Sequence, residues 1–214
     1  MVLLGVSRSG TTMLREMLNQ HPEIAIPTES YFIPQLWTRH RESPDPDRFA
    51  NDLGRLARVR EWGVTPAEVR ERLSAKPSFA EAIQAPYRAY AAARGKRRYG
   101  DKTPAYMQHL DVLERAFPGA QYVHLVRDGR DAGLSFVEMR RRPRFNWARP
   151  RGLGTFAAQW RREVEAARRS VGVGPPAAIS SCATRTWWRS RRPSCASYAS
   201  SSGSASTPRC SSTT

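Results

Sequence analysis

The segment GVSRSGTTMLREML, residues 5–18, constrains this chain more than any other stretch. The apolar run Val2–Val6 leads into it and predicts a short buried strand. From Thr11 onward the apolar residues follow a helical period, and His21-Pro22 would end that helix. The sequence therefore predicts a strand, a tight Gly/Ser turn and a helix.

The turn carries groups that suit an anion. Backbone N–H groups in such a turn converge, and the helix N-terminus adds about half a positive charge. Ser9, Thr11 and Thr12 supply hydroxyl donors, and Arg8 supplies a planar cation. We expect the turn to hold phosphate or sulfate. The alternative is a strand–helix turn without a ligand, because Ser, Thr and Gly are also ordinary turn residues.

The same turn departs from the loop of ATP- and GTP-hydrolysing P-loop proteins, which follows the pattern G-x-x-x-x-G-K-[ST]. The spacing from Gly5 to Gly10 agrees with that pattern, but Thr11 stands where the lysine should be. The cation has moved inside the loop, to Arg8. This difference argues against nucleotide hydrolysis.

The rest of the chain alternates between strand and helix patterns. Ile24–Ile26 and Gln121–Val126 predict further strands, and helices are expected at Tyr106–Phe117 and Gly154–Arg169. This alternation predicts an α/β fold with a largely parallel sheet. Ligands of such sheets bind beyond the carboxyl ends of the strands, where the loops after Val6 and Val126 open.

Residues 31–98 look mainly helical and would form an insert. Thr65–Glu68 and Ser78–Glu81 each have the pattern of a capping box, in which the first and fourth residues bond reciprocally.

Charge and cysteine usage limit the alternatives. The net charge is +16, of which five arginines after residue 171 contribute +5 without any acid, so the first 171 residues carry +11. This surplus suits a phosphorylated nucleotide or another polyanion. The three cysteines all lie after residue 181, so we expect no metal site in the remainder. No run has the roughly 18 apolar residues of a membrane span, and we expect a cytoplasmic protein.

The stretch SRSGTT, between a predicted strand and helix, resembles the 5′-phosphosulfate loop of the sulfotransferases. These enzymes use 3′-phosphoadenosine 5′-phosphosulfate (PAPS). Arginine at the position of Arg8 resembles the Golgi-type and many bacterial members, whereas cytosolic members usually have lysine there. The resemblance implies that Arg8, Ser9, Gly10, Thr11 and Thr12 bind the donor.

A second segment, HLVRDGRDAGLSF, has Arg127 at a predicted strand end and Ser135 eight residues later. This spacing resembles the 3′-phosphate site of the same family, and RDGRD resembles the tyrosylprotein sulfotransferase branch. The resemblance implies that Arg127 and Ser135 grip one phosphate, as an arginine and a hydroxyl can. The alternative is a strand–helix turn with solvated charges.

Two more residues resemble the tyrosylprotein branch. Glu29 lies 21 residues after Arg8, and Lys102 lies 25 residues before Arg127. The resemblance implies that Glu29 is a catalytic base, that Lys102 and Arg8 are catalytic too, and that no metal is needed. The alternatives are that Glu29 caps a helix and that Lys102 pairs with Asp101 in solvent.

The resemblance implies a P-loop-like three-layer fold with a central parallel sheet and a helical insert. It also implies an enzyme that moves a sulfuryl group from PAPS to a hydroxyl or amine acceptor. Two other functions remain open. One is a P-loop-like nucleotide kinase or NTPase, and the other is a polyanion-binding protein that uses the basic segment Arg140–Arg151 and the C-terminal tail.

The tail, residues 172–214, resembles nothing in the family and lacks an apolar period and acids. We expect a disordered tail after an incomplete sulfotransferase-like domain at 1–171. Residues 182–214 can be back-translated with GC-rich codons. When the reading frame of that DNA is then moved one base earlier, one allowed translation begins LRYEDLV. Family members have an R-Y-E-D-L-like segment after the second phosphate site. We therefore expect a frameshift near residues 170–181, which could leave an inactive relic, with a natural basic tail as the alternative.

Overall fold

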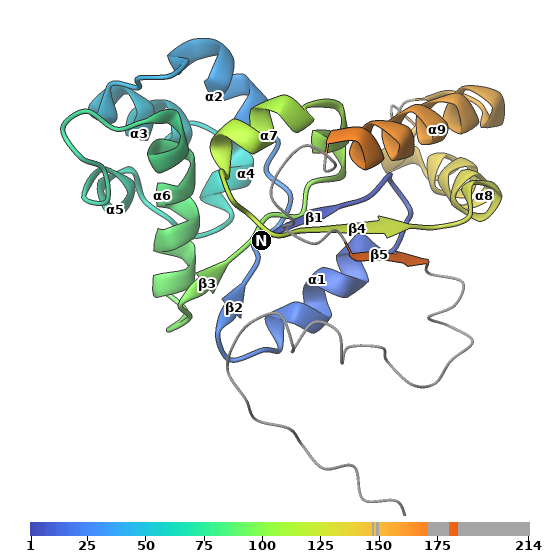
Figure 1. The fold of residues 1–214 in the computed structure, drawn as a ribbon, viewed down its shortest axis with the longest axis horizontal. Helices are drawn as coiled ribbons and strands as arrows, with labels where there is room; N and C mark the ends of the chain where they lie inside the picture. The colour runs from blue at the N-terminus through green and yellow to red at the C-terminus, as the bar shows by residue number, and fades with distance from the viewer. Residues whose placement is uncertain (147, 149, 171–179, 184–214) are drawn as a thin grey trace, which may run out of the picture.

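The structure, a computed structural model, describes residues 1–146, 148 and 150–170, together with the strand at 180–183. Within these residues the strands are β1 (Val2–Leu4), β2 (Ile24–Ala25), β3 (Arg98–Tyr99), β4 (Tyr122–Val126) and β5 (Ser180–Ala183). The pairs β1–β4, β4–β5 and β2–β3 are all parallel. An isolated parallel bridge between Val2 and Asp101, just beyond β3, joins the two parts. The strand order is therefore β2-β3-β1-β4-β5 (Figure 1).

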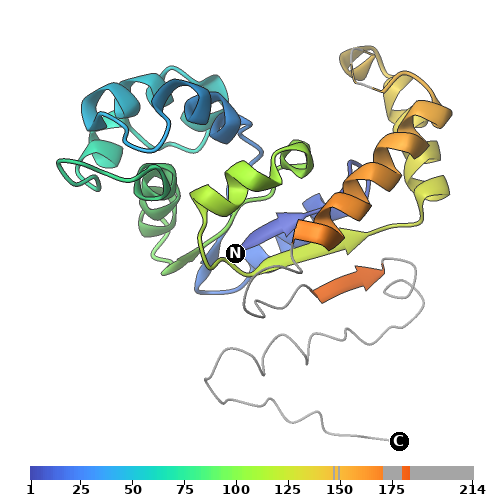
Figure 2. The same ribbon diagram turned by 45° about the horizontal axis from the view of Figure 1, so that its top comes forward.

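Helices cover both faces of this sheet, which is why β1 is buried on both sides. Helix α1 (Thr11–Asn19) lies against one face, where Leu14 and Leu18 pack on Leu3 and Ile24. Helices α7 (Leu110–Ala116) and α9 (Leu153–Ser170) lie over the other face, and α8 (Gly129–Arg140) packs beside α9 (Figure 2). The three-layer α/β fold with a parallel sheet is confirmed.

The expected helical insert lies at one side of the sheet (Figure 2). It consists of α2 (Phe32–His40), α3 (Pro46–Gly54), α4 (Ala57–Arg60), α5 (Pro66–Arg70) and α6 (Phe79–Ala92). Aromatic rings fill its centre, with Trp62 at 5.9 Å from Phe32 and 5.1 Å from Tyr87 between ring centroids. Val2 and Leu4 of β1 belong to the same hydrophobic cluster, so insert and sheet share one core.

One of the two expected capping boxes is complete. The Thr65 hydroxyl accepts from the Glu68 N–H, and the Glu68 carboxylate accepts from the Thr65 N–H at 2.8 Å. The Ser78 hydroxyl likewise accepts from the Glu81 N–H, but the Glu81 carboxylate accepts from the Ser74 N–H at 2.7 Å. The second prediction is therefore wrong for one of its two hydrogen bonds. The Glu81 carboxylate bonds to the Ser74 N–H of the preceding turn and not to the Ser78 N–H.

The single helix expected at Tyr106–Phe117 is wrong. A 3₁₀ helix, η1 (Pro104–Gln108), comes first, His109 breaks the chain with φ −138°, and α7 follows. The hydroxyl of Tyr106 accepts a hydrogen bond from the Ile33 N–H at 3.2 Å. This tertiary contact with the start of α2 is not visible in the local sequence pattern.

Strand β5 falls inside residues 172–214, where the sequence predicts disorder. The structure differs from that expectation at four residues, because the backbone of Ser180–Ala183 pairs with β4 and satisfies hydrogen-bonding groups at its edge. Residues 171–179 and 184–214, which make up most of the tail and most of the segment of the expected frameshift, lie outside the described residues.

Asp101 ties the sheet to the insert. Its carbonyl accepts from the Leu3 N–H at 2.8 Å, and its carboxylate accepts from the Tyr87 hydroxyl at 2.7 Å and the Thr103 hydroxyl at 3.3 Å. The residue is 1% exposed, and its other carboxylate oxygen has no hydrogen-bond partner in the part of the chain that the structure describes. Burial raises the pKa of this carboxyl to about 6.

We predict that Asp101→Asn removes a pH dependence of stability. The folded state keeps the Asp101 proton to higher pH than the unfolded state, so the wild type loses stability as pH rises from about 4 to about 6. A rise from 3.8 to about 6 corresponds to about 3 kcal/mol at neutral pH. Denaturant unfolding at several pH values would measure the difference between the two proteins. A difference that stays constant from pH 4 to pH 7 would contradict the assignment.

Candidate active site

The strand order changes direction at the carboxyl ends of β1 and β4. The chain leaves β1 through α1 toward β2, on one side, and leaves β4 through α8 and α9 toward β5, on the other. Adjacent parallel strands whose connections diverge in this way form the usual ligand position of open α/β sheets. The loop with Arg8 follows β1, and the loop with Arg127 follows β4, so both predicted anion sites lie at this position.

The first loop is tightly packed. A Cβ at Gly5 would come within 2.8 Å of the Thr11 Cγ2 atom and 3.0 Å of the Leu125 carbonyl oxygen. Gly10 precedes α1 with φ 96°, a conformation that glycine adopts without strain. Arg8 also has a positive φ, 71°, which costs on the order of 1–3 kcal/mol for a residue with a Cβ.

The polar groups of this loop fit an anion. Ser9 is 1% exposed, and its hydroxyl oxygen has no hydrogen-bond partner among the described residues. A buried hydroxyl without a partner costs about 1–3 kcal/mol, so a ligand that bonds to it is favoured. Thr11 is buried beside it, and the first turn of α1 contains no acidic residue. These donors, with the free N–H groups of a helix start, suit a phosphate or sulfate group.

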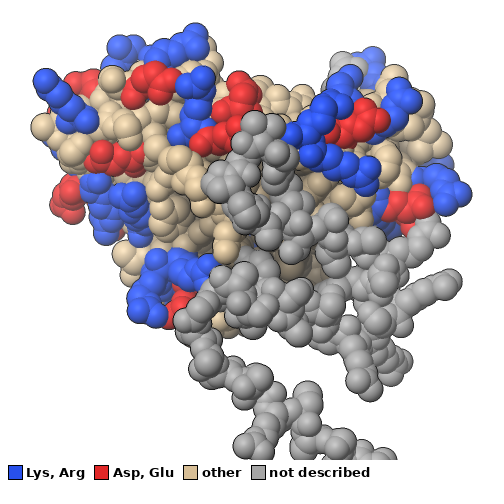
Figure 3. Space-filling view, viewed as in Figure 1, with Lys and Arg blue, Asp and Glu red and all other residues tan. Residues whose placement is uncertain are grey.

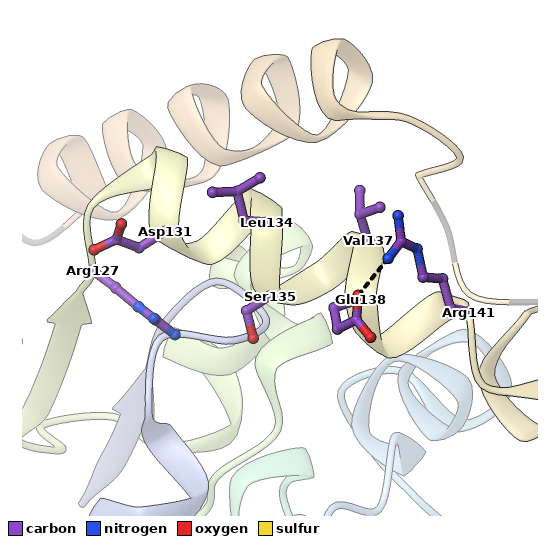
Figure 4. Close-up of a pocket in the computed structure, with 7 residues that line it drawn as sticks. All are labelled: Arg127, Asp131, Leu134, Ser135, Val137, Glu138 and Arg141. Carbon is purple, nitrogen blue, oxygen red and sulfur yellow. Dashed lines mark hydrogen bonds and ion pairs between the residues drawn. The ribbon is translucent and has the colours of Figure 1, made fainter.

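The second loop lies against the first. The Arg127 guanidinium donates to the carbonyl oxygen of Arg8 at 3.0 Å, and the Arg8 Nε donates to the Ser135 hydroxyl at 3.1 Å. Figure 4 shows Arg127 and Ser135 on an open groove of about 510 Å³ along α8. The groove is lined by Arg127, Asp131, Leu134, Ser135, Val137, Glu138 and Arg141. The two predicted phosphate sites therefore adjoin each other.

Lys102 connects the first loop to Glu29. It follows β3, is 3% exposed, forms an ion pair with Glu29 and donates to the Thr12 hydroxyl at 3.1 Å. Lys102 is buried and its ion-pair partner is Glu29, so the alternative that Lys102 pairs with Asp101 in solvent is wrong. Glu29 does not occupy the cap of α2, which Tyr31 occupies. The structure thus brings together the anion loop, a cation and a carboxylate.

Buried contacts fix the segment that carries Glu29. The Trp62 indole donates to the Thr28 carbonyl at 3.1 Å, and the Ser30 and Tyr106 hydroxyls share a hydrogen bond at 3.3 Å. The residues on both sides of Glu29 are therefore anchored, and the half-buried carboxylate is held between them.

Tyr31 completes the surroundings of Glu29, and sequence reasoning did not predict it. Its hydroxyl donates to Oε2 of Glu29 at 2.8 Å, while Lys102 binds Oε1. Partial burial, followed by the charge of Glu29, raises the pKa of the Tyr31 hydroxyl, so the hydroxyl remains a donor. The only signal in the sequence is a tyrosine two residues after a candidate base.

Figure 3 shows where charged side chains of the described residues lie on one face of the molecule. Lys and Arg side chains gather over α9 and over the insert, with Asp and Glu among them. In the basic segment Arg140–Arg151, the Arg140 guanidinium donates to the carbonyl oxygens of Asn146 and Arg151, so it is used within the fold. Arg140 is therefore not available to a polyanion, as the polyanion-binding alternative would require.

None of the helices that the structure describes is long and apolar enough to cross a membrane. Among the described residues, no three His, Cys, Asp or Glu side chains come together as metal ligands would.

Comparison with known proteins agrees with this geometry. The model of the sulfotransferase family matches residues 1–179. Nodulation protein NoeE of Sinorhizobium fredii is 34% identical over 134 residues, which cover 59% of this chain and 28% of that protein. Human protein-tyrosine sulfotransferase 1 is 32% identical over 145 residues, which cover 62% of this chain and 32% of that protein. The chain thus spans about a third of the length of the curated relatives it matches.

Solved structures share the fold. The sulfotransferase domain of the Synechococcus PCC 7002 olefin synthase gives a TM-score of 0.61 at 22% identity and covers 93% of this chain and 70% of that one. The sulfotransferase domain from the curacin biosynthetic pathway gives 0.54 at 20% identity, with 85% and 66% covered. Because the sulfotransferase fold is itself P-loop-like, the fold alone does not separate a transferase from an NTPase. The match over residues 1–179 makes that distinction, and the chain belongs to the sulfotransferase family.

Proposed function

We propose that this chain transfers a sulfuryl group from PAPS to a hydroxyl or amine acceptor. The observation that carries the proposal is the position of Lys102, which contacts Thr12 of the anion loop and Glu29 at once. A cation between an anion site and a carboxylate suits a transfer reaction, because charge develops on the leaving oxygen while the acceptor loses a proton.

The donor would lie across the two loops. Arg8, Ser9, Gly10, Thr11 and Thr12 would bind its 5′-phosphosulfate, in line with the orphaned Ser9 hydroxyl. Arg127 and Ser135 would bind its 3′-phosphate. Because Arg8 contacts Ser135, and Arg127 contacts Arg8, the two ends of one bisphosphorylated nucleoside would be held by residues that already touch.

The residues would divide the chemistry between them. Glu29 accepts the proton that the acceptor loses as its oxygen or nitrogen bonds to sulfur. Lys102 and Arg8 stabilise the negative charge left on the phosphate oxygen when its bond to sulfur breaks. The protein supplies position and charge and forms no covalent bond in this scheme. PAPS, when bound, supplies the activated sulfuryl group.

We predict that Glu29→Gln lowers kcat by roughly 10²–10⁴, the usual range for loss of a general base. Glutamine keeps an oxygen that can accept from Lys102 but removes the counter-charge of this buried ammonium, so thermal unfolding of the variant is measured beside its rate. Transfer of ³⁵S from labelled PAPS to a panel of peptide, carbohydrate, lipid and small hydroxylated acceptors would measure the rate. The matched control is Glu23→Gln, since Glu23 pairs with Arg97 on the surface. An unchanged rate in Glu29→Gln would remove Glu29 from the mechanism.

We predict that Arg127→Ala abolishes a preference for nucleotides with a 3′-phosphate. Affinity for 3′,5′-ADP should fall about 10- to 100-fold, as expected for a lost charge-assisted hydrogen bond, while affinity for 5′-AMP should change little. Isothermal titration calorimetry would measure both. The control is Arg130→Ala, because the Arg130 side chain is 83% exposed and pairs with Asp128 in the same loop.

The same titration tests the competing enzyme class. A sulfotransferase should bind 3′,5′-ADP more tightly than ATP, whereas a kinase or NTPase should prefer ATP. Clear preference of the wild-type protein for ATP would overturn the proposed function.

We also propose that the tail results from a frameshift near residues 170–181. Sequencing the gene across this region from independent genomic DNA should reveal the shift or a corrected reading of the type LRYEDLV. A protein with the corrected tail should then transfer sulfate faster than the chain as given. An unshifted gene with no such alternative frame would contradict this proposal.

A further inference from the structure

Tyr31 occupies a position that local backbone rules assign to another kind of residue. It is the N-cap of α2, where Ser, Thr, Asp and Asn are preferred, and its side chain makes no capping hydrogen bond. Its φ is 60°, in the left-handed region that asparagine and glycine tolerate and bulky residues avoid. The residue is 38% exposed, so part of the ring is buried and contributes to stability. Capping and backbone preferences nevertheless give no reason for a tyrosine here.

The strained conformation of Tyr31 produces a hydrogen bond to Glu29, the candidate base. With its backbone left-handed, Tyr31 turns back toward Glu29, two residues earlier, and donates to Oε2 at 2.8 Å. Lys102 binds Oε1 of the same carboxylate. A carboxylate offers about four acceptor positions, so each oxygen keeps one lone pair for a further donor. The rotation of the carboxylate is thus fixed by two donors from different parts of the chain.

We propose that Tyr31 is a positioning residue for the candidate base: it fixes the Glu29 carboxylate so that one lone pair faces the acceptor. This inference rests on the proposed function for its catalytic meaning. Without the hydroxyl, the carboxylate would be held by Lys102 alone and could rotate about its terminal bond. Proton acceptance would then slow, although the base and the donor site would remain present.

The neighbouring anchors are placed to support this role. Ser30 bonds to Tyr106, and the Ile33 N–H donates to the same Tyr106 hydroxyl. The backbone on both sides of Tyr31 is therefore held by one buried side chain, which keeps the left-handed turn in place. Strained residues persist only where the surrounding structure determines them in this way.

The test compares two substitutions at Tyr31. Tyr31→Phe keeps the ring and the strain but removes the hydroxyl, and kcat should fall roughly 10- to 100-fold, the range for a lost hydrogen bond to a charged group. Tyr31→Asn relieves the strain and can cap α2 but loses the buried part of the ring, and it should lower kcat by a similar factor because it also lacks the phenol hydroxyl. The affinity for 3′,5′-ADP should stay within about 2-fold in both, because the donor site is untouched. Tyr90→Phe, in the insert, is the matched control.

A double-mutant cycle separates positioning from general damage. If Tyr31 acts through Glu29, Tyr31→Phe should change the residual rate of Glu29→Gln by less than about 2-fold, because the group that it positions is gone. A full 10- to 100-fold further loss in that background would overturn the inference. So would an unchanged kcat in Tyr31→Phe alone.

The cycle also distinguishes failure of this inference from failure of the proposed function. If the wild-type protein transfers no sulfate to any acceptor, the proposed function is wrong. The wild type, Tyr31→Phe, Glu29→Gln and the double variant are then compared by thermal unfolding. Non-additive midpoints for Tyr31→Phe and Glu29→Gln would then support the contact that fixes the carboxylate. Additive midpoints would overturn the positioning role.

Discussion

The site depends on the burial of one cation, Lys102, between Glu29 and Thr12. An ammonium group that is 3% exposed destabilises a fold by several kcal/mol unless partners replace its water. The Glu29 carboxylate and the Thr12 hydroxyl are those partners, and each comes from a different segment. The segment after β3, the first turn of α1 and the loop after β2 must therefore meet at one point. The same requirement that stabilises the fold assembles the candidate reaction centre.

The strand order explains why this meeting point is also a binding site. Strand β1 lies between β3 and β4, and Asp101, next to Lys102, bridges to Val2 of β1. This bridge places Lys102 beside the loop that follows β1. On the other side, β4 delivers Arg127 against Arg8. The carboxyl ends of β3, β1 and β4 thus lie side by side, and each is followed by one cation, Lys102, Arg8 and Arg127 respectively. An anion bound in the loop after β1 would therefore have a cation on each side.

The sequence predicts the two strand–turn–helix segments well because each is encoded within a short stretch of the chain. Glycine spacing, hydroxyls and a change of hydrophobic period are local signals, and the helix from Thr11 and the strand at 122–126 agree with them. The pairs Glu29–Lys102 and Arg8–Ser135 join residues 73 and 127 positions apart, and only the resemblance brought their members together. Tyr31, Tyr106 and the two-residue strand β3 have no local signal, because their places follow from tertiary contacts. The break at His109 was missed for the same reason.

Backbone strain offers a separate route to functional residues. Among the described residues, Arg8, Tyr31 and Arg41 have a positive φ without being glycine. Arg41 lies at the C-terminal end of α2 with φ 52° and ψ −143°, outside the left-handed helical region, and its guanidinium lies 5.7 Å from the centroid of the Trp37 ring. Arg8 and Tyr31 lie on the two sides of Lys102, one in the loop that suits the donor and one beside the candidate base. At both positions glycine or asparagine would fit the backbone better, and in both the side chain makes a contact that those residues would lose. Arg8 and Tyr31 both depart from the backbone preferences of their residue types, and both lie near the buried Lys102 ammonium. The chemistry of that site is the best explanation of the two departures.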